Sequence, residues 1–332
     1  VANSSLGTEG KNKRGSWYNW FKEGRIRDNA NPNVASDHYE LYKEDFLLMQ
    51  KMGITHCRFG ISWSRIEPVK GIFNIGELDH YAQMLECMSS HGIIPMLTVM
   101  ENDLPMWFLA EGGFENDGCE KIFIHYVRKV AETLGKSVKE FITFDEPNLY
   151  AINSYFYGSW PPGKRSTKSW AKVLGGIAKC HIAAYETIHE ICGDVKVGCA
   201  VNMRVFEPKD EKSFYQRNCA IKMENYFQNA LIKAVTFGEA QKPLKNFGKT
   251  KGNYCDFWAL SYYTRSTVSG LSDGIKEGAA VDDLGQEIYP KGIVECAEKL
   301  YKLKAMPIYI TSNGVCDNED SFRIKYICEH LK

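Results

Sequence analysis

The sequence has no excess of positive or negative charge. Its 332 residues include 41 lysines and arginines and 41 aspartates and glutamates, so the formal net charge is zero. There is no basic stripe and no long block of like charge, whereas proteins that bind nucleic acid or anionic lipid concentrate positive charge. We therefore expect neither nucleic acid nor a membrane surface as a partner, and a neutral small molecule fits better.

Long hydrophobic runs are also missing. No apolar segment approaches the roughly 18 residues of a membrane-spanning helix. The first residues do not combine a charged segment with an apolar one, as a secretory leader does. The sequence therefore predicts no membrane segment and a cytoplasmic location.

Cysteine pairs and ligand clusters are absent as well. The 11 cysteines include no C-x-x-C pair, and they are scattered through expected strands and helices. This pattern is typical of buried thiols in a reducing compartment and not of a disulfide framework. The 8 histidines and 11 cysteines never fall into metal-ligand spacings, and no glycine-rich phosphate loop is visible. We expect no metal and no cofactor.

Neither repeats nor low-complexity linkers interrupt the chain. A single α/β barrel domain commonly has about 250 residues or more, so this length does not require a second domain. We interpret residues 1–332 as one domain.

Aromatic residues are abundant, at 13% of the chain, with 18 tyrosines and 7 tryptophans. Their flat faces pack protein cores and also suit the apolar faces of sugars. Trp107 and Trp160 lie in or after segments that follow expected strands. Both fit core packing and sugar stacking, and both are candidates for substrate binding.

Short apolar runs alternate with amphipathic helical patterns along the chain, which favours a parallel sheet covered by helices. The expected strands are residues 1–5, 55–63, 93–100, 140–146, 195–202, 256–263 and 307–311. The expected helices are residues 38–52, 77–91, 119–134, 169–191, 211–237, 292–303 and 321–331. Residues 266–286, rich in Gly, Ser and Asp, are expected to form a long loop.

Two polar motifs stand at the ends of expected strands. Residues 143–147 read TFDEP and residues 309–314 read YITSNG. They resemble the acid/base segment, T-[FL]-N-E-P, and the nucleophile segment, I-T-E-N-G, of retaining glycoside hydrolases of family 1. The first segment keeps its glutamate as Glu146, and the second has Ser312 where the family has its nucleophilic carboxylate.

Further segments resemble the same family in order along the chain. Residues 37–53 resemble D-H-Y-x-x-Y-K-E-D-x-x-L-M-x-x-[LM]-G, and residues 58–66 (RFGISWSRI) resemble R-F-S-I-S-W-S-R-I. Residues 256–264 and 285–292 resemble D-F-[LI]-G-[IV]-N-Y-Y-T and G-W-E-[IV]-Y-P-x-G. The resemblance implies an α/β fold, a (β/α)8 TIM barrel with its site at the carboxyl ends of the strands. The sequence supplies at most seven strands, lacking strand eight and part of strand one.

The resemblance also implies the catalytic roles. Retaining hydrolysis needs a carboxylic acid that protonates the leaving oxygen and a carboxylate about 5 Å away that attacks the anomeric carbon. Glu146 matches the general acid/base, and Ser312 marks the nucleophile position. Arg58 and Tyr262 match family residues that contact the nucleophile and lower its pKa.

The sugar-binding shell implied by the resemblance is altered. Glu101 and Asn102 stand where the family has histidine and tryptophan. Asp145 replaces an asparagine, and Gly7 replaces a glutamine. Asn313, which keeps the family residue after the nucleophile position, is a further candidate for substrate binding.

Two functional interpretations remain open. In the first, the chain is a β-glycosidase-like O-glycosyl hydrolase that acts on β-linked glycosides or oligosaccharides. The acids Glu101, Asp145 and Glu146 then favour a cationic ligand, a different sugar or a displaced mechanism. In the second, the chain is a catalytically impaired or non-catalytic carbohydrate-binding protein on the same barrel.

Overall fold

Seven parallel strands form the centre of the molecule. The computed structural model describes residues 1–245, 247–270 and 272–332. The strands pair in the order of the sequence, and β8 pairs with β6. Their bounds are β1 (Ala2–Asn3), β2 (His56–Gly60), β3 (Ile94–Met100), β4 (Glu140–Asp145), β5 (Lys196–Pro208), β6 (Trp258–Ser269) and β8 (Ile308–Ser312).

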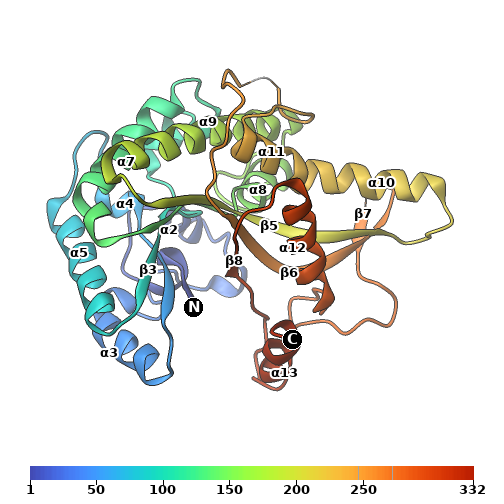
Figure 1. Ribbon diagram of the computed structural model, residues 1–332, viewed down its shortest axis with the longest axis horizontal. Helices are drawn as coiled ribbons and strands as arrows, with labels where there is room; N and C mark the ends of the chain where they lie inside the picture. Colours follow the sequence, from blue (N-terminus) through green and yellow to red (C-terminus); the bar gives the residue numbers. More distant parts are fainter. Residues whose placement is uncertain (246, 271) are drawn as a thin grey trace.

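Helices cover the outside of these strands. Figure 1 shows α3, α5, α7 and α9 following one another around the sheet, and α12 beside β6 and β8. The longer helices are α3 (His38–Lys51), α5 (Ile75–Ser90), α7 (Cys119–Leu134), α9 (Thr167–Cys192), α10 (Phe214–Glu224), α11 (Ala230–Phe237), α12 (Lys291–Leu303) and α13 (Arg323–His330). Short helices α1 (Ser5–Thr8), α2 (Ser16–Lys22), α4 (Trp63–Ile66), α6 (Met106–Ala110) and α8 (Pro147–Ala151) follow strand ends or join them.

The barrel is open on one side. Within the described residues, β8 pairs with β6 and β1 pairs with β2, but β8 and β1 do not pair with each other. Strand β1 is only two residues long. The expected (β/α)8 barrel is thus confirmed, together with its open place for strand eight.

Local sequence signals mark the start of three of the longer helices. Helices α5, α9 and α10 each begin after a residue whose side chain accepts a hydrogen bond from the first turn, namely Asn74, Ser166 and Ser213. Such caps satisfy backbone N–H groups that have no partner inside the helix. The expected helix 211–237 forms as α10 and α11 joined by a π-helical turn, Asn225–Asn229.

The prediction of a long loop at residues 266–286 is partly wrong. Strand β6 continues to Ser269, and β7 (Ser272–Gly274) pairs with it in antiparallel fashion. Thr264, Ser266 and Val268 are buried while the residues between them are less so. This alternation is the period of a strand, but its small polar side chains conceal the pattern in the sequence.

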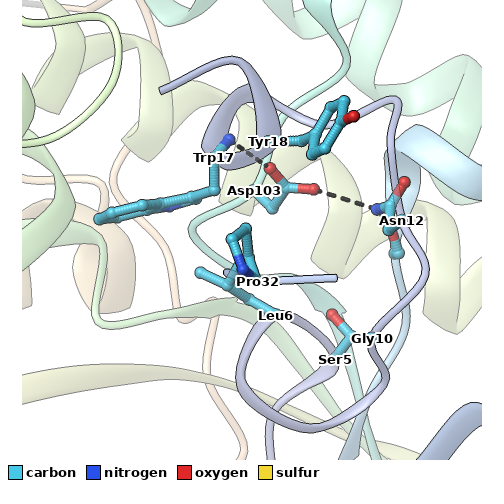
Figure 2. A pocket seen from close by; sticks show the side chains of 9 residues that line it. Ser5, Leu6, Gly10, Asn12, Trp17, Tyr18, Pro32 and Asp103 are labelled. Carbon is cyan, nitrogen blue, oxygen red and sulfur yellow. Dashed lines mark hydrogen bonds between the residues drawn. The ribbon is translucent and has the colours of Figure 1, made fainter. Parts of the chain in front are cut away.

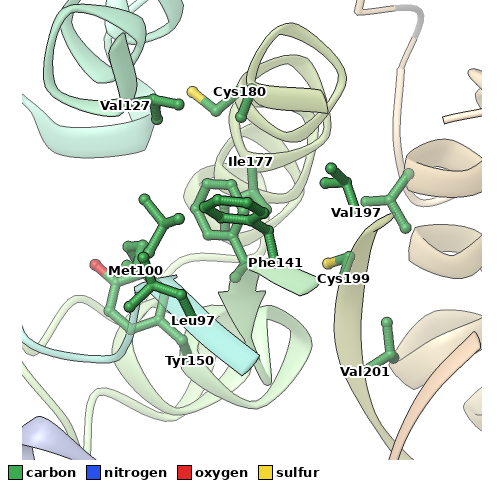
Figure 3. Packing of buried hydrophobic residues seen from close by; sticks show 14 of the residues in the cluster. Leu97, Met100, Val127, Phe141, Tyr150, Ile177, Cys180, Val197, Cys199 and Val201 are labelled. Atoms are coloured by element: carbon green, nitrogen blue, oxygen red, sulfur yellow. The ribbon is translucent and has the colours of Figure 1, made fainter. Parts of the chain in front are cut away.

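Both faces of the parallel sheet are buried. Figure 3 shows Leu97 of β3, Phe141 of β4 and Val197 of β5 near Ile177 and Cys180 of α9. A second cluster fills the barrel interior and consists of Met96, Ile142, Ala200, Phe257 and Ala259. Burial on both faces explains why the strands read as continuous apolar runs. Among the described residues, no helix combines the length and apolar character needed to cross a membrane.

Truncation of Phe123 in α7 tests how much this packing stabilises the fold. Its ring is fully buried and lies 4.8 Å from the ring of Phe144 and 5.5 Å from that of Trp63. We expect Phe123→Ala to lower the free energy of unfolding by about 3–5 kcal/mol, because it leaves a cavity. Urea unfolding measures the loss. The control, Phe214→Ala in α10, removes a ring that is 74% exposed and should change stability by less than about 0.5 kcal/mol; equal losses would contradict the prediction.

Candidate active site

Glu146 lies at the carboxyl end of β4, where the chain turns into α8. Its backbone φ is 47°, in the left-handed region that non-glycine residues rarely adopt. The Glu146 backbone N–H donates to the carbonyl of Ala200 in β5 at 2.8 Å. Unfavourable backbone geometry persists only where the surrounding structure holds it, and it is common at functional sites. The turn therefore fixes the position of this carboxyl group.

The pKa of Glu146 is raised from 4.5 to about 7. Burial is the main cause, and the charge of Asp145 raises the pKa further. Contacts with Asn202 and Tyr263, and the charge of Arg58, oppose the rise. At neutral pH a substantial fraction of Glu146 is therefore a carboxylic acid with a proton to donate.

Tyr263 connects Glu146 with Ser312. Its hydroxyl hydrogen-bonds the Ser312 hydroxyl at the end of β8 and also contacts the Glu146 carboxyl group. The expectation that Tyr262 contacts residue 312 is wrong. The Tyr262 hydroxyl instead donates to the carbonyl of Tyr289 at 2.6 Å.

Strand alternation explains this correction. Phe257 and Ala259 of β6 belong to the cluster inside the barrel, whereas Trp258 and Leu260 belong to the outer core. Continuing the period of two places odd-numbered residues inside, and therefore Tyr263 rather than Tyr262. This alternation could be read from the sequence. The family motif alone does not decide between the adjacent residues Tyr262 and Tyr263.

Arg58 and Asp145 form a buried ion pair beside Glu146. The Arg58 guanidinium on β2 lies 2.8 Å from the Asp145 carboxylate at the end of β4, and both side chains are almost fully buried. Burial disfavours the charge on Arg58, but Asp145 and Glu101 outweigh it and the pKa of Arg58 is raised. The cation therefore remains charged and balances the acids around it.

Glu101 follows β3 and points towards the N-terminal segment. Its carboxylate accepts hydrogen bonds from the hydroxyls of Ser4 at 2.9 Å and Ser5 at 2.7 Å. Burial raises its pKa, whereas Arg58 and the two serines oppose the rise. A Cβ atom at Gly60 would lie 2.2 Å from the Glu101 carboxylate. Glycine at position 60 thus leaves room for the acid at position 101.

A large cavity of about 950 Å³ begins at Glu146. It is lined by side chains from the ends of β5 and β6, from α9 and from the π-helical segments, and Trp160, Asn202 and Tyr263 are among them. Such a volume is typical of small-molecule sites. Arg58, Asp145, Glu101 and Ser312 lie beside this cavity and do not line it.

A second pocket is too small for an organic ligand. It measures about 10 Å³, about the space of one water molecule. Figure 2 shows Asp103 in this pocket accepting hydrogen bonds from the backbone of Trp17 and the side chain of Asn12. The Ser16 and Ser64 hydroxyls also donate to Asp103. This carboxylate holds the N-terminal segment against the end of β3.

The other predicted site residues are dispersed. Trp160 lines the large cavity, but Trp107 packs edge-on against Trp63, and its indole N–H donates to the carbonyl of Glu67. The carbonyl of Asn102 accepts from the indole of Trp17 at 2.9 Å. Gly7 is exposed on α1, and the Asn313 amide donates to the carbonyl of Tyr262. The sequence did not predict five residues that lie in or beside the site, namely Ser4, Ser5, Asn202, Arg204 and Tyr263.

Across residues 1–245, 247–270 and 272–332, no group of three or more histidine, cysteine, aspartate or glutamate side chains is arranged to hold a metal ion. The acids of the site are instead balanced by Arg58 and by hydroxyl groups.

Removal of Arg58 should destabilise the protein. We expect Arg58→Met to lower the free energy of unfolding by about 3–5 kcal/mol at pH 7, because Asp145 then remains buried without its partner. Urea unfolding measures the loss, and the double variant Arg58→Met/Asp145→Leu should recover part of it. Arg128→Met, which breaks the exposed pair with Glu190, is the control and should cost less than about 1 kcal/mol. A loss for Arg58→Met no larger than the control's would refute the prediction.

The raised pKa of Glu146 should appear as a pH dependence of stability. Its proton is bound more tightly in the folded state than in the unfolded one, so its stabilisation is complete below pH 4.5 and is lost as the pH rises through about 7. Glu146→Gln cannot ionise. We expect its stability relative to the wild type to increase by roughly 3 kcal/mol between pH 4 and pH 8, measured by urea unfolding. The exposed Glu211, changed to glutamine, is the control; a pH-independent difference for Glu146→Gln would contradict the assignment.

Comparison with known proteins places these residues in a family context. Residues 4–332 match Glycosyl hydrolase family 1. Beta-glucosidase A of Thermotoga maritima is 29% identical over 93% of this chain and 76% of its own length. A 1,4-beta-D-glucan glucohydrolase of Thermotoga neapolitana is 27% identical, over 93% of this chain and 80% of its own.

Solved structures agree. A beta-glycosidase from Pyrococcus horikoshii superposes with a TM-score of 0.92 and 31% identity, covering 100% of this chain and 78% of its own. A beta-glucosidase from Thermotoga maritima, solved in complex with glucoimidazole, superposes with a TM-score of 0.92 and 27% identity, covering 100% and 83%. The sequence match and the shared barrel show that this chain belongs to glycosyl hydrolase family 1.

Proposed function

We propose that this chain is an O-glycosyl hydrolase of the β-glycosidase type, acting on β-linked glycosides within one barrel domain, residues 1–332. Glu146 is its general acid/base, and Ser312 occupies the position of the nucleophile. One observation carries the proposal. Glu146 is a buried carboxyl group with a pKa of about 7 at the inner end of a cavity of about 950 Å³. A carboxyl group with this pKa is suited to donate and accept protons at neutral pH.

The protonation step follows from this geometry. The Glu146 carboxyl group donates its proton to the glycosidic oxygen as the bond from that oxygen to the anomeric carbon breaks. The bonding electron pair leaves with the oxygen, and positive charge develops on the sugar ring. Water then adds to the anomeric carbon, and the Glu146 carboxylate accepts the proton that this water loses. Bond making and bond breaking therefore balance without a covalent intermediate.

Ser312 does not supply the missing carboxylate in this scheme. An alcohol needs a base to become a nucleophile, and its partner is the Tyr263 hydroxyl. Burial and the charge of Glu146 raise the pKa of Tyr263 far above neutrality, so the phenol remains protonated. Hydrolysis by the wild-type chain should therefore be slow and should depend on Glu146.

Acidic residues support a sugar different from that of a typical family site. Asp145 and Glu101 stand beside Glu146, and they share a single guanidinium, that of Arg58. Carboxylates accept hydrogen bonds but do not donate them. A ligand group that reaches this acidic cluster would therefore have to donate, as sugar hydroxyls and a cationic amino group do.

A second candidate function is carbohydrate binding without turnover. The neutral Ser312 hydroxyl favours this candidate, because a retaining mechanism requires a carboxylate at that place. The two functions share the fold and the cavity. Only the hydrolase forms product at a rate that is proportional to the enzyme concentration and that depends on Glu146.

Restoration of the carboxylate is the direct test. We expect Ser312→Glu to raise kcat/KM for an aryl β-glycoside by roughly 100-fold or more, a conservative figure beside the about 10⁶-fold cost of deleting a covalent nucleophile. The new carboxylate would lie beside the Tyr263 hydroxyl. Release of the phenol, followed by absorbance, measures the rate.

Matched variants separate the two functions. Ser312→Gln has nearly the same size as Ser312→Glu but no charge, and it should not gain activity. Glu146→Gln should lower the rate of the wild type and of Ser312→Glu by roughly 10²–10⁴ for a poor leaving group. If the wild type shows no turnover and Ser312→Glu gains none, while the glycoside still binds, the hydrolase proposal is contradicted and carbohydrate binding without turnover is supported.

A further inference from the structure

The large cavity extends well beyond the proposed reaction centre. It starts at Glu146 and continues past the π-helical segment Ile152–Tyr157 to α9 and to the second π-helical segment, Asn225–Asn229. At about 950 Å³ it lies near the upper end of the range for small-molecule sites. A ligand that fills it is therefore larger than one sugar ring.

Aromatic side chains form a continuous wall in this cavity. The ring of Phe156 packs edge-on against that of Trp170, with 5.6 Å between the ring centres. The ring centres of Trp170 and Tyr226 are 6.2 Å apart. Phe156 and Tyr226 are 38% and 42% exposed, although they line a concave surface. Exposed aromatic faces in a hollow favour a flat apolar ligand, because its binding removes them from water.

One cation interrupts this wall. Among the described lining residues, Arg204 of β5 is the only lysine or arginine. Its guanidinium lies 5.0 Å from the centre of the Phe227 ring and 3.8 Å from the Asp273 carboxylate. In the described part of the chain, no hydrogen bond from the guanidinium is formed. A guanidinium has five N–H donors in a planar fork, so most of its bonding capacity is left for a ligand.

The surrounding acids do not satisfy Arg204. Asp273 approaches it only at 3.8 Å and accepts a hydrogen bond from Ser266. Asp282, which also lines the cavity, is occupied by backbone N–H groups of Leu284 and Gln286. Glu146, with a pKa of about 7, is only partly ionised near pH 7. Burial accordingly lowers the pKa of Arg204 below its usual range, because no acid fully compensates the desolvated cation.

The strand sets the distance between Arg204 and the reaction centre. Asn202, which contacts the Glu146 carboxyl group, lies two residues before Arg204 on β5. Residues two apart share one face of a strand and lie roughly 7 Å apart. Both side chains line the cavity. A ligand group beside Arg204 is thus about one or two aromatic rings away from the oxygen that Glu146 protonates.

We propose that this cavity binds an aromatic aglycone and that Arg204 selects aglycones carrying a carboxylate one or two rings away from the glycosidic oxygen. The inference rests on the proposed function only in naming the ligand as an aglycone. The aromatic wall binds the ring system, and the guanidinium fork pairs with the two carboxylate oxygens. A carboxamide of the same shape has one neutral acceptor oxygen, so Arg204 contributes less to its affinity.

Two free aglycones of matched size test this proposal without any sugar. The probes are 6-hydroxy-2-naphthoate and 6-hydroxy-2-naphthamide, titrated into the wild-type protein by calorimetry at pH 7.5. We expect the carboxylate to bind about tenfold more tightly than the amide, as for one charge-assisted pair. Arg204→Gln should remove this preference, because it weakens binding of the naphthoate far more than binding of the naphthamide.

A second variant moves the preference in the opposite direction. Asp273→Asn removes the competing carboxylate but can still accept from Ser266, so it should increase the preference for the naphthoate. Thermal unfolding checks that both variants are folded. Equal binding of the two probes by the wild type, or an undiminished preference in Arg204→Gln, overturns the inference. Absence of glycoside hydrolysis with the expected naphthoate preference would instead count against the proposed function alone.

Discussion

One buried guanidinium balances the charge at the carboxyl ends of the strands. Arg58 pairs with Asp145 at 2.8 Å and also offsets the charge of Glu101. One cation cannot neutralise three buried acids, and burying an unpaired charge is costly. Burial and, after it, the charge of Asp145 raise the pKa of the third acid, Glu146, to about 7. The acid strength on which the proposed chemistry depends is thus set first by burial and then by neighbouring acids that one cation only partly balances.

The shape of the site separates this charged cluster from the apolar cavity. Arg58, Asp145 and Glu101 do not line the cavity, which extends from Glu146 towards the aromatic residues of α9 and the π-helical turns. Glu146 is where the two regions meet, and its turn at φ 47° holds it there. Glu146 therefore has charged neighbours outside the cavity and aromatic residues among those that line it.

Much of the fold could be predicted from the sequence, because parallel strands buried on both faces leave plain apolar runs. Helix α7 begins and ends where the periodicity predicts. The β6–β7 hairpin could not be predicted in this way, since its buried positions carry Thr and Ser. At the site, the motifs identified Glu146 and Ser312, but they misassigned Tyr262. Arg204 and Ser5 were beyond reach, because their roles depend on which distant segments the barrel brings together.

Gly60 constrains how such a pocket can arise. The family pattern has serine at this position, and a Cβ there would lie 2.2 Å from the Glu101 carboxylate, which would have to shift from its present place. An acid introduced at position 101 before the change to glycine would therefore have to adopt a different side-chain position from the present one. The absence of a side chain at position 60 thus makes room for the acid where it now lies, and reversal of that one change would force the carboxylate to move.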